Sequence, residues 1–161
     1  MNFSTVRTGE LIAGISGVAL FIIMFLTWFE LPDIAGGQLQ RIAEAVGADT
    51  SYSAWQAFDF TDIVLLLAAV AGVGLAVLAS AQSNVQLPVA ASAIAAGLGI
   101  LATLLVLYRI IDPPNEWDRA YGVFLGLIAS AGIAAGGWMA MQEEGSSFGG
   151  EDDRFGGGRE T

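Results

Sequence analysis

The sequence predicts an all-α protein: a four-helix transmembrane bundle with a long first outer loop that contains short interfacial helices, and a disordered acidic C-terminal tail. Two neighbouring apolar runs, 63–79 and 88–108, contain no charged residue and are joined by an uncharged polar loop. Two further runs, 11–29 and 123–141, share this character. A helix rises about 1.5 Å per residue, so roughly 20 residues cross a hydrocarbon core about 30 Å thick. Residues 1–141 are therefore the predicted transmembrane domain.

The composition agrees with this class. Of 161 residues, 55% are apolar and only 14% are charged, which is too hydrophobic for a soluble domain of this size. Cysteine and histidine are both absent. This excludes disulfides, thiolate metal sites and the usual acid–base group at neutral pH. The net charge of −10 argues against binding to nucleic acid and against general attraction to anionic headgroups.

The first helix is expected over residues 6–29, with Arg7 facing Glu10 at i,i+3. A cleaved signal peptide is the competing interpretation, because one Arg precedes the apolar run. However, the run is longer than the 7–15 residues of a typical signal core, and it ends in bulky residues rather than in a small-residue cleavage site.

The outer loop, 30–60, contains two short helical patterns. Apolar residues recur at i, i+3, i+4 and i+7, namely at Leu39, Ile42, Ala43 and Val46, and Gly47 follows as a stop signal. We expect a short amphipathic helix here, lying on the membrane or on the bundle. Ser53 and Gln56 have the spacing of a capping box. The rings around them, Tyr52, Trp55 and Phe58, are expected to anchor the loop at the headgroup level.

The remaining helices are expected over 61–80, 88–109 and 120–142. Thr61 is a candidate cap for the second, proline suits the first turn of the third, and a double proline ends it. The segment 142–161 is rich in Gly and acidic residues. It has too little apolar surface to offset the entropy of ordering, so it is predicted to be disordered.

The sequence gives little evidence for the orientation of the chain in the membrane. Four crossings place both termini on one side, and arginines divide equally between the two sides, with Arg7, Arg154 and Arg159 on the side of the termini. The termini are expected in the cytoplasm, because the long aromatic loop is typical of an external structure.

Small residues at four-residue spacing predict where helices approach each other closely. They are Gly122, Gly126, Gly132 and Gly136 in the last helix, and Gly9, Ala13 and Gly17 in the first. Packing within one bundle is the favoured interpretation, and homo-oligomerisation is the alternative.

One polar cluster is a candidate site. Its members are expected at a single membrane boundary: Arg109, Asp112, Asp59, Asp62, Arg119 and Glu30. They suggest either a pocket under the outer loop that binds a ligand or partner, or a structural network that ends the third helix. The structural interpretation is favoured, because Arg at a helix C-terminus followed by proline is a routine stop.

The sequence offers no other chemistry. The middle of each predicted span lacks charge, and no nucleotide, zinc or serine-hydrolase motif is present. We therefore assign no catalytic, cofactor-binding or metal residue, expect no cofactor, and predict that the protein is not an enzyme.

Several short motifs carry a family resemblance: Trp-Phe at 28–29, Ser-Ala-Trp-Gln-Ala-Phe at 53–58, Tyr-Arg-Ile-Ile-Asp-Pro-Pro at 108–114 and Gly-Gly-Trp at 136–138. With these motifs, residues 9–144 resemble small actinobacterial four-span membrane proteins that have no assigned activity. The resemblance implies a bacterial plasma membrane and supplies no mechanism. The topology is also similar in outline to claudin-type tetraspans, but the Gly-Leu-Trp motif and paired cysteines of claudins are absent.

Two functions follow as hypotheses. The first is a structural or accessory subunit in the lipid bilayer that contacts protein partners through its helices and outer loop. The alternative is an oligomeric transport or channel component for a small neutral solute, with the path between protomers.

Overall fold

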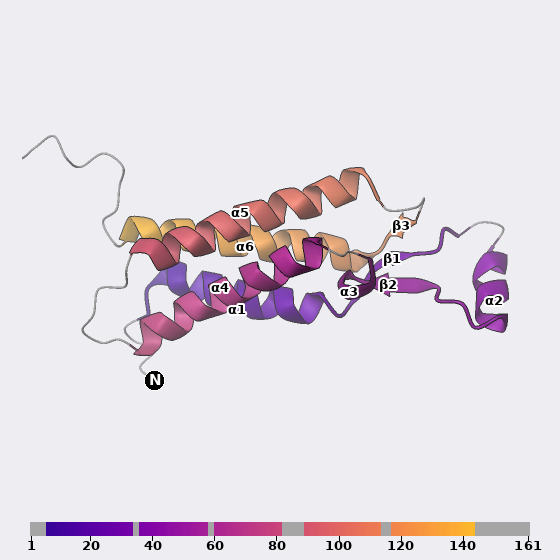
Figure 1. Ribbon diagram of the computed structural model, residues 1–161, viewed down its shortest axis with the longest axis horizontal. Helices are drawn as coiled ribbons and strands as arrows, with labels where there is room; N and C mark the ends of the chain where they lie inside the picture. Colours follow the sequence, from indigo (N-terminus) through magenta and orange to yellow (C-terminus); the bar gives the residue numbers. More distant parts are fainter. Residues whose placement is uncertain (1–5, 34–35, 58–59, 82–88, 114–116, 144–161) are drawn as a thin grey trace, which may run out of the picture.

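The body of the protein is a ring of four helices. The computed structural model describes residues 6–33, 36–57, 60–81, 89–113 and 117–143. The four helices lie side by side along one axis (Figure 1): α1 (Thr8–Ile23), α4 (Thr61–Ala81), α5 (Val89–Ile111) and α6 (Tyr121–Glu143). Helix α1 packs against α4 and α6, and α5 packs closely against α6 and more loosely against α4. The order around the ring is therefore α1, α4, α5, α6.

Three of these helices are long and apolar enough to span a membrane. They are Thr61–Ala81, Ala91–Ile111 and Tyr121–Glu143, with mean hydropathies of 2.7, 2.2 and 1.7. Large apolar side chains cover their outer surfaces, for example Val70, Leu104 and Ile128, which are 60%, 57% and 69% exposed. A soluble domain rarely exposes so much contiguous apolar surface. The length and surface of the helices indicate a membrane protein.

The prediction that the first helix continues to residue 29 is wrong. Helix α1 has 16 residues and ends at Ile23, and the chain then forms strand β1 (Thr27–Glu30). The β-branched and aromatic residues Thr27, Trp28 and Phe29 favour an extended chain. The Trp28 indole N–H also donates to the carbonyl of Ile23 at 2.8 Å, and the Leu26 backbone N–H donates to the same carbonyl at 2.9 Å, so both bonds hold the turn that follows the helix.

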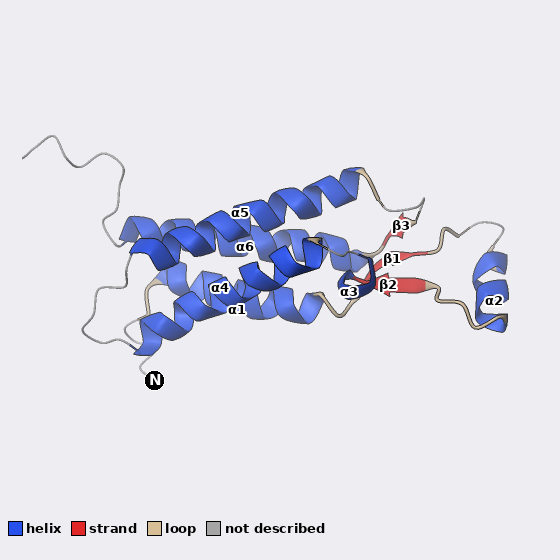
Figure 2. Cartoon of the chain, viewed as in Figure 1, coloured by secondary structure: helices blue, strands red, loops and turns tan. Residues whose placement is uncertain are grey.

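The protein is mostly helical, which is compatible with the all-α prediction, and it also contains a small sheet that the sequence does not predict (Figure 2). Strand β1 is the centre of a three-stranded sheet, between β2 (Ser51–Ser53) and β3 (Asp118–Arg119). Both pairings are antiparallel, with Glu30 opposite Ser51 in β2 and Asp118 in β3. The sheet therefore joins three segments that are distant in sequence at one end of the bundle.

Two short helices belong to the same end. Helix α2 (Gln38–Ala45) lies between β1 and β2 in the chain, and α3 (Ala54–Ala57) follows β2 directly. The Gln56 side chain accepts from the Ser53 backbone N–H at 3.2 Å, so this half of the predicted capping box is confirmed. The predicted tail beyond Glu143 and the position of Phe58 lie outside the described residues.

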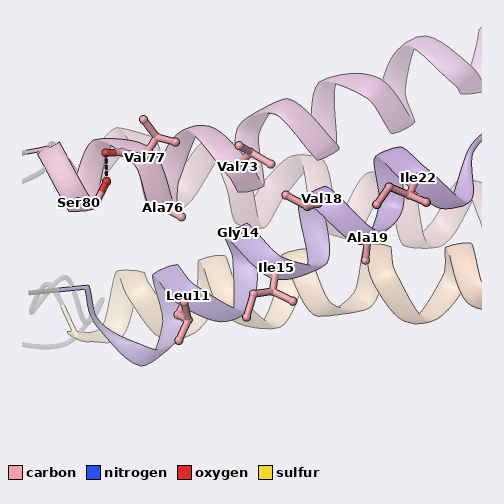
Figure 3. Close-up of a pocket in the computed structure, with 10 residues that line it drawn as sticks. All are labelled: Leu11, Gly14, Ile15, Val18, Ala19, Ile22, Val73, Ala76, Val77 and Ser80. Carbon is pink, nitrogen blue, oxygen red and sulfur yellow. Dashed lines mark hydrogen bonds between the residues drawn. The ribbon is translucent and has the colours of Figure 1, made fainter. Parts of the chain in front are cut away.

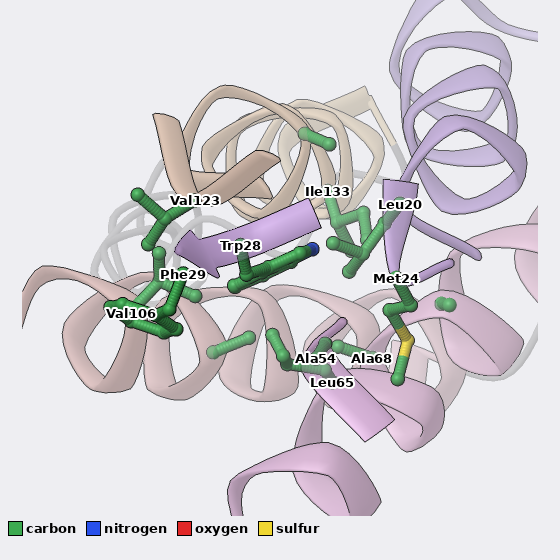
Figure 4. Close-up of a cluster of buried hydrophobic side chains, with 13 residues drawn as sticks. Leu20, Met24, Trp28, Phe29, Ala54, Leu65, Ala68, Val106, Val123 and Ile133 are labelled. Carbon is green, nitrogen blue, oxygen red and sulfur yellow. The ribbon is translucent and has the colours of Figure 1, made fainter. Parts of the chain in front are cut away.

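The core is centred on Trp28 and Phe29, at the sheet end of the bundle (Figure 4). Both are fully buried or nearly so, although they belong to a strand that the sequence assigns to a helix. Leu20, Leu65 and Val106 surround them from α1, α4 and α5. Strand β1 thus places the rings of Trp28 and Phe29 between the ends of the helices, and these rings form the centre of the hydrophobic core.

Candidate functional site

The sheet end of the molecule contains all three strands and both short helices. Helices α2 and α3 and the three strands gather there, while the ends of α4 and α6 and the start of α1 and α5 lie at the opposite end (Figure 1). The residues of the sheet end come from two separate connections, α1–α4 and α5–α6, and β1 joins them because it pairs with both β2 and β3.

Glycines in α6 hold β1 in place. A Cβ at Gly122 would overlap the Thr27 carbonyl, and a Cβ at Gly126 would overlap the Trp28 ring. The backbone N–H of Ala120 donates to the Trp28 carbonyl at 2.9 Å. The strand and the first turns of α6 are therefore one close-packed unit.

Aromatic contacts connect the outer loop to this unit. The rings of Tyr52 and Trp117 meet edge to face, with centroids 4.5 Å apart. The rings of Phe25 and Trp55 lie 5.9 Å apart. Such pairs contribute about 0.5–1.5 kcal/mol each beyond area burial. They tie β2 and α3 to the segment before β3 and to the end of α1.

Helix α2 ends where the sequence predicts a stop. Gly47 has a φ of +72°, a left-handed conformation that glycine adopts without steric cost. The N–H of Ala48 donates to the Ala43 carbonyl at 2.8 Å, and that of Gly47 donates to Glu44 at 3.1 Å. These two bonds form a Schellman motif, which satisfies the last carbonyls of the helix.

Helix α2 stands apart from the bundle, at the far end of the β1–β2 hairpin (Figure 1). None of its residues is buried. Its apolar residues Leu39 and Ile42 are 41% and 61% exposed, and Val46, which follows the last helical residue, is 74% exposed. The amphipathic prediction is confirmed, and of the two expected positions, on the membrane or on the bundle, the structure excludes the bundle. The hairpin carries it outward and leaves its apolar face uncovered within the described chain.

Local hydrogen bonds fix the position of α2 on its hairpin. The Gln40 side-chain amide donates to the Leu31 carbonyl at 3.3 Å, and the Arg41 guanidinium donates to the Gly36 carbonyl at 3.2 Å. The polar side of the helix therefore faces its own loop, which leaves the apolar side for other contacts.

The predicted polar cluster is divided among separate contacts. Arg119 donates from Nε to the Ile110 carbonyl at 2.5 Å, and so ties β3 to the last turn of α5. Asp112 accepts from the Tyr108 hydroxyl at 3.0 Å. Glu30 lies on the sheet opposite Asp118, and Asp59 falls outside the described residues. Arg109 is half-buried near the end of α5.

Two buried carboxylates mark opposite ends of the ring. Asp62 in the first turn of α4 is 4% exposed, and Glu10 in the first turn of α1 is 3% exposed. Glu10 accepts from the Arg7 backbone N–H at 2.8 Å. Carboxylates at helix N-termini are stabilised by the helix dipole, which favours a structural role for both. The sequence suggests Glu10 only as a partner for Arg7 and gives no signal of its burial.

The predicted packing residues take part in two kinds of contact, between two helices and between a helix and strand β1. Gly9, Ala13 and Gly136 bring the backbones of α1 and α6 together, and Gly17 brings α1 against α4. Gly132 faces Ser16 on α1. Gly122 and Gly126, by contrast, receive β1 and not a helix.

Comparisons with protein-family models, with curated proteins and with solved structures find no match, so the geometry alone must indicate the function. Within the described residues, no group of three or more Asp or Glu side chains could hold a metal ion. The most distinctive feature of this end is therefore a surface, the apolar face of α2.

Proposed function

We propose that this protein is a non-enzymatic accessory subunit of a bacterial plasma membrane, which presents α2 to a partner protein outside the bilayer. The observation that carries the proposal is the exposure of Leu39, Ile42 and Val46 on a helix that its hairpin holds away from the bundle. An apolar helix face of this kind is the recognition element of helix-in-groove binding. The partner would supply an apolar groove.

In this proposal the four helices anchor α2 to the membrane. Close contacts at Gly9, Gly17, Gly72 and Gly136 use the small-residue faces of α1, α4 and α6 inside one protomer. The sheet then fixes the hairpin to the bundle through the buried rings of Trp28 and Phe29. A rigid connection of this kind favours a fixed presentation of α2 over a freely mobile loop.

In this proposal the chain crosses the bilayer four times, with both termini in the cytoplasm. Helix α1 alone rises about 24 Å, which falls short of a hydrocarbon core of about 30 Å. Strand β1, with four residues in the extended form, adds about 13 Å. Helix and strand together supply a first crossing. The resemblance to small actinobacterial four-span proteins is consistent with this arrangement.

Cross-linking in native membranes tests the proposal. The chain has no cysteine, so a Val46→Cys variant carries a single site for a thiol-reactive cross-linker at the C-terminal edge of the apolar face. We expect a specific adduct with one partner protein. Adding Ile42→Glu should abolish the adduct, because a buried carboxylate without a partner is costly. Adding Ala45→Glu introduces the same charge at an exposed position off the face and should leave it unchanged. An adduct that persists with Ile42→Glu, or no adduct at all, would contradict the proposal.

An oligomeric transport component is the second candidate. Gly74 on α4 and Gly97 on α5 have open space where a side chain would project, although both belong to potential spans. Glycines on an outer helix surface let a second protomer approach closely. Mass measurement in mild detergent distinguishes the two candidates, because a strict monomer could not enclose a path between protomers.

A further inference from the structure

A second surface feature lies on the helical bundle, remote from α2. It is an apolar groove along α1 and α4 (Figure 3), and its walls include Ile15, Val18, Ile22, Val73 and Val77. Its floor is a close contact, because a Cβ at Gly14 would lie 2.5 Å from the Ala76 Cβ. The two helices meet at these small residues, and the larger side chains on either side leave a channel between them.

The dimensions and the lining suit a hydrocarbon chain. The groove has a volume of about 510 Å³, and Ser80 is its one polar side chain. Sites for small molecules span about 300–1,000 Å³, so this volume is sufficient for an elongated apolar ligand. Branched side chains on its walls would hold a partner helix at a distance, since helices in membranes associate where small residues allow close approach. A hydrocarbon chain is thinner and more flexible than a helix, so it can enter the groove between these side chains.

Polar groups lie at one end of the groove. Leu11 lines that end, and its backbone N–H donates to the Arg7 carbonyl at 3.1 Å, so Arg7 stands one turn beyond the groove. The Arg7 side chain is exposed. Ser80 lies at the same end, in the last turn of α4 (Figure 3). An apolar groove with an exposed arginine one helical turn beyond its end matches the division of a phospholipid into acyl chain and phosphate.

We propose that this groove binds one phospholipid, with an acyl chain along α1 and α4 and the phosphate at Arg7. The net charge of −10 does not oppose this, because Arg7 acts locally and a zwitterionic headgroup also carries a phosphate. Of the nearby acidic groups, Glu10 is buried and accepts from the Arg7 backbone N–H. Glu143 ends α6, which packs on a different side of α1 from α4.

Lipid retention tests the site in the full-length protein. The purified, delipidated protein is mixed with micelles that contain either dioleoyl phosphatidylcholine or dioleoylglycerol, and native mass spectrometry counts the retained lipids. The two probes share their acyl chains and differ in the phosphate-containing headgroup. We expect one phosphatidylcholine per protomer and about fivefold weaker retention of the diacylglycerol, as for one exposed ion pair.

Variants separate the groove from the headgroup contact. Arg7→Gln should remove the preference for phosphatidylcholine and leave retention of the diacylglycerol unchanged. Ile15→Trp fills the groove at a position that is 63% exposed, so the fold should tolerate it, and retention of both lipids should fall. Ile128→Trp is the matched control on α6, where the native side chain is 69% exposed, and it should retain lipid as the wild type does.

Three results would overturn the proposal: equal retention of the two lipids by the wild type, wild-type retention by Ile15→Trp, or a dimer that excludes lipid from the groove. The comparison of Arg7→Gln with the wild type does not depend on Ile15→Trp folding correctly. The test is also independent of the proposed function, since α2 lies at the other end of the molecule.

Discussion

The indole of Trp28 lies directly on the backbone of Gly126, at a distance that leaves no room for a Cβ at residue 126. This contact joins β1 to α6 and explains how a strand can occupy the end of a helical bundle. Trp28 is fully buried, and the glycine provides the flat surface on which its ring rests. The position of the sheet, and with it the direction of the hairpin that carries α2, depends on this pair.

Replacing Gly126 by Ala should therefore destabilise the protein by about 1–3 kcal/mol, because the added methyl group forces the buried ring to move. Thermal unfolding in detergent measures the effect. Gly74→Ala is the matched control, since a Cβ there meets nothing within 4 Å and the residue also belongs to an apolar helix. Combining Gly126→Ala with Trp28→Phe should recover part of the loss, because a smaller ring relieves the overlap. Additive losses would show that the two residues are not coupled.

The contact between α1 and α6 leads to a second prediction. A Cβ at Gly136 would lie 2.5 Å from the Ala13 nitrogen and 2.7 Å from the Gly9 oxygen. Both are backbone atoms, which cannot rotate away as a side chain can. Gly136→Val should separate the two helices and cost about 3 kcal/mol, at the upper end of overpacking effects. The neighbouring Ala135 is exposed, so Ala135→Val should change the melting temperature little. Equal effects of both variants would contradict the close approach of α1 and α6.

The long helices are predictable because each contains an uninterrupted apolar run, and length with composition is enough to identify them. The end of α1 is not predictable, because Thr27, Trp28 and Phe29 carry no charge and continue the uncharged run of the helix before them. Hydropathy does not distinguish a helix from a buried strand when the run is short. What decides the conformation is non-local: the pairing of β1 with β2 and β3, and the space above Gly126.

The candidate surface is predictable in part for the same reason. The periodic residues Leu39, Ile42 and Val46 and the stop at Gly47 are local signals, and α2 forms with the expected face. Where that face points depends on the β1–β2 hairpin, which the sequence does not reveal. The spacing of Gly122 and Gly126 likewise indicates that another segment approaches this helix closely. The spacing does not show whether that segment is a strand or a helix.

Charges on the sheet lead to a third prediction. Glu30 in β1 lies opposite Asp118 in β3, and both side chains are exposed. Like charges at directly opposite positions destabilise a sheet. Asp118→Lys should therefore raise stability by about 0.2–1 kcal/mol, and the gain should shrink at high salt. Asp33→Lys makes the same change of charge at an exposed position outside the sheet and should not reproduce the gain. A gain of equal size from Asp33→Lys would point to the net charge of the protein as the cause.

The proposed topology leads to a fourth prediction, which single-cysteine labelling can test because the chain has no cysteine of its own. Asp33 and Asp112 are exposed at the sheet end, and Thr8 and Ala81 are exposed at the opposite end. A membrane-impermeant maleimide added to intact cells should label cysteines at residues 33 and 112. It should label those at 8 and 81 only after permeabilisation. Labelling of 8 and 81 alone in intact cells would invert the orientation. Labelling of 8 but not 81 would mean that the two ends of the α1–α4 pair lie on different sides, which a four-crossing bundle does not allow.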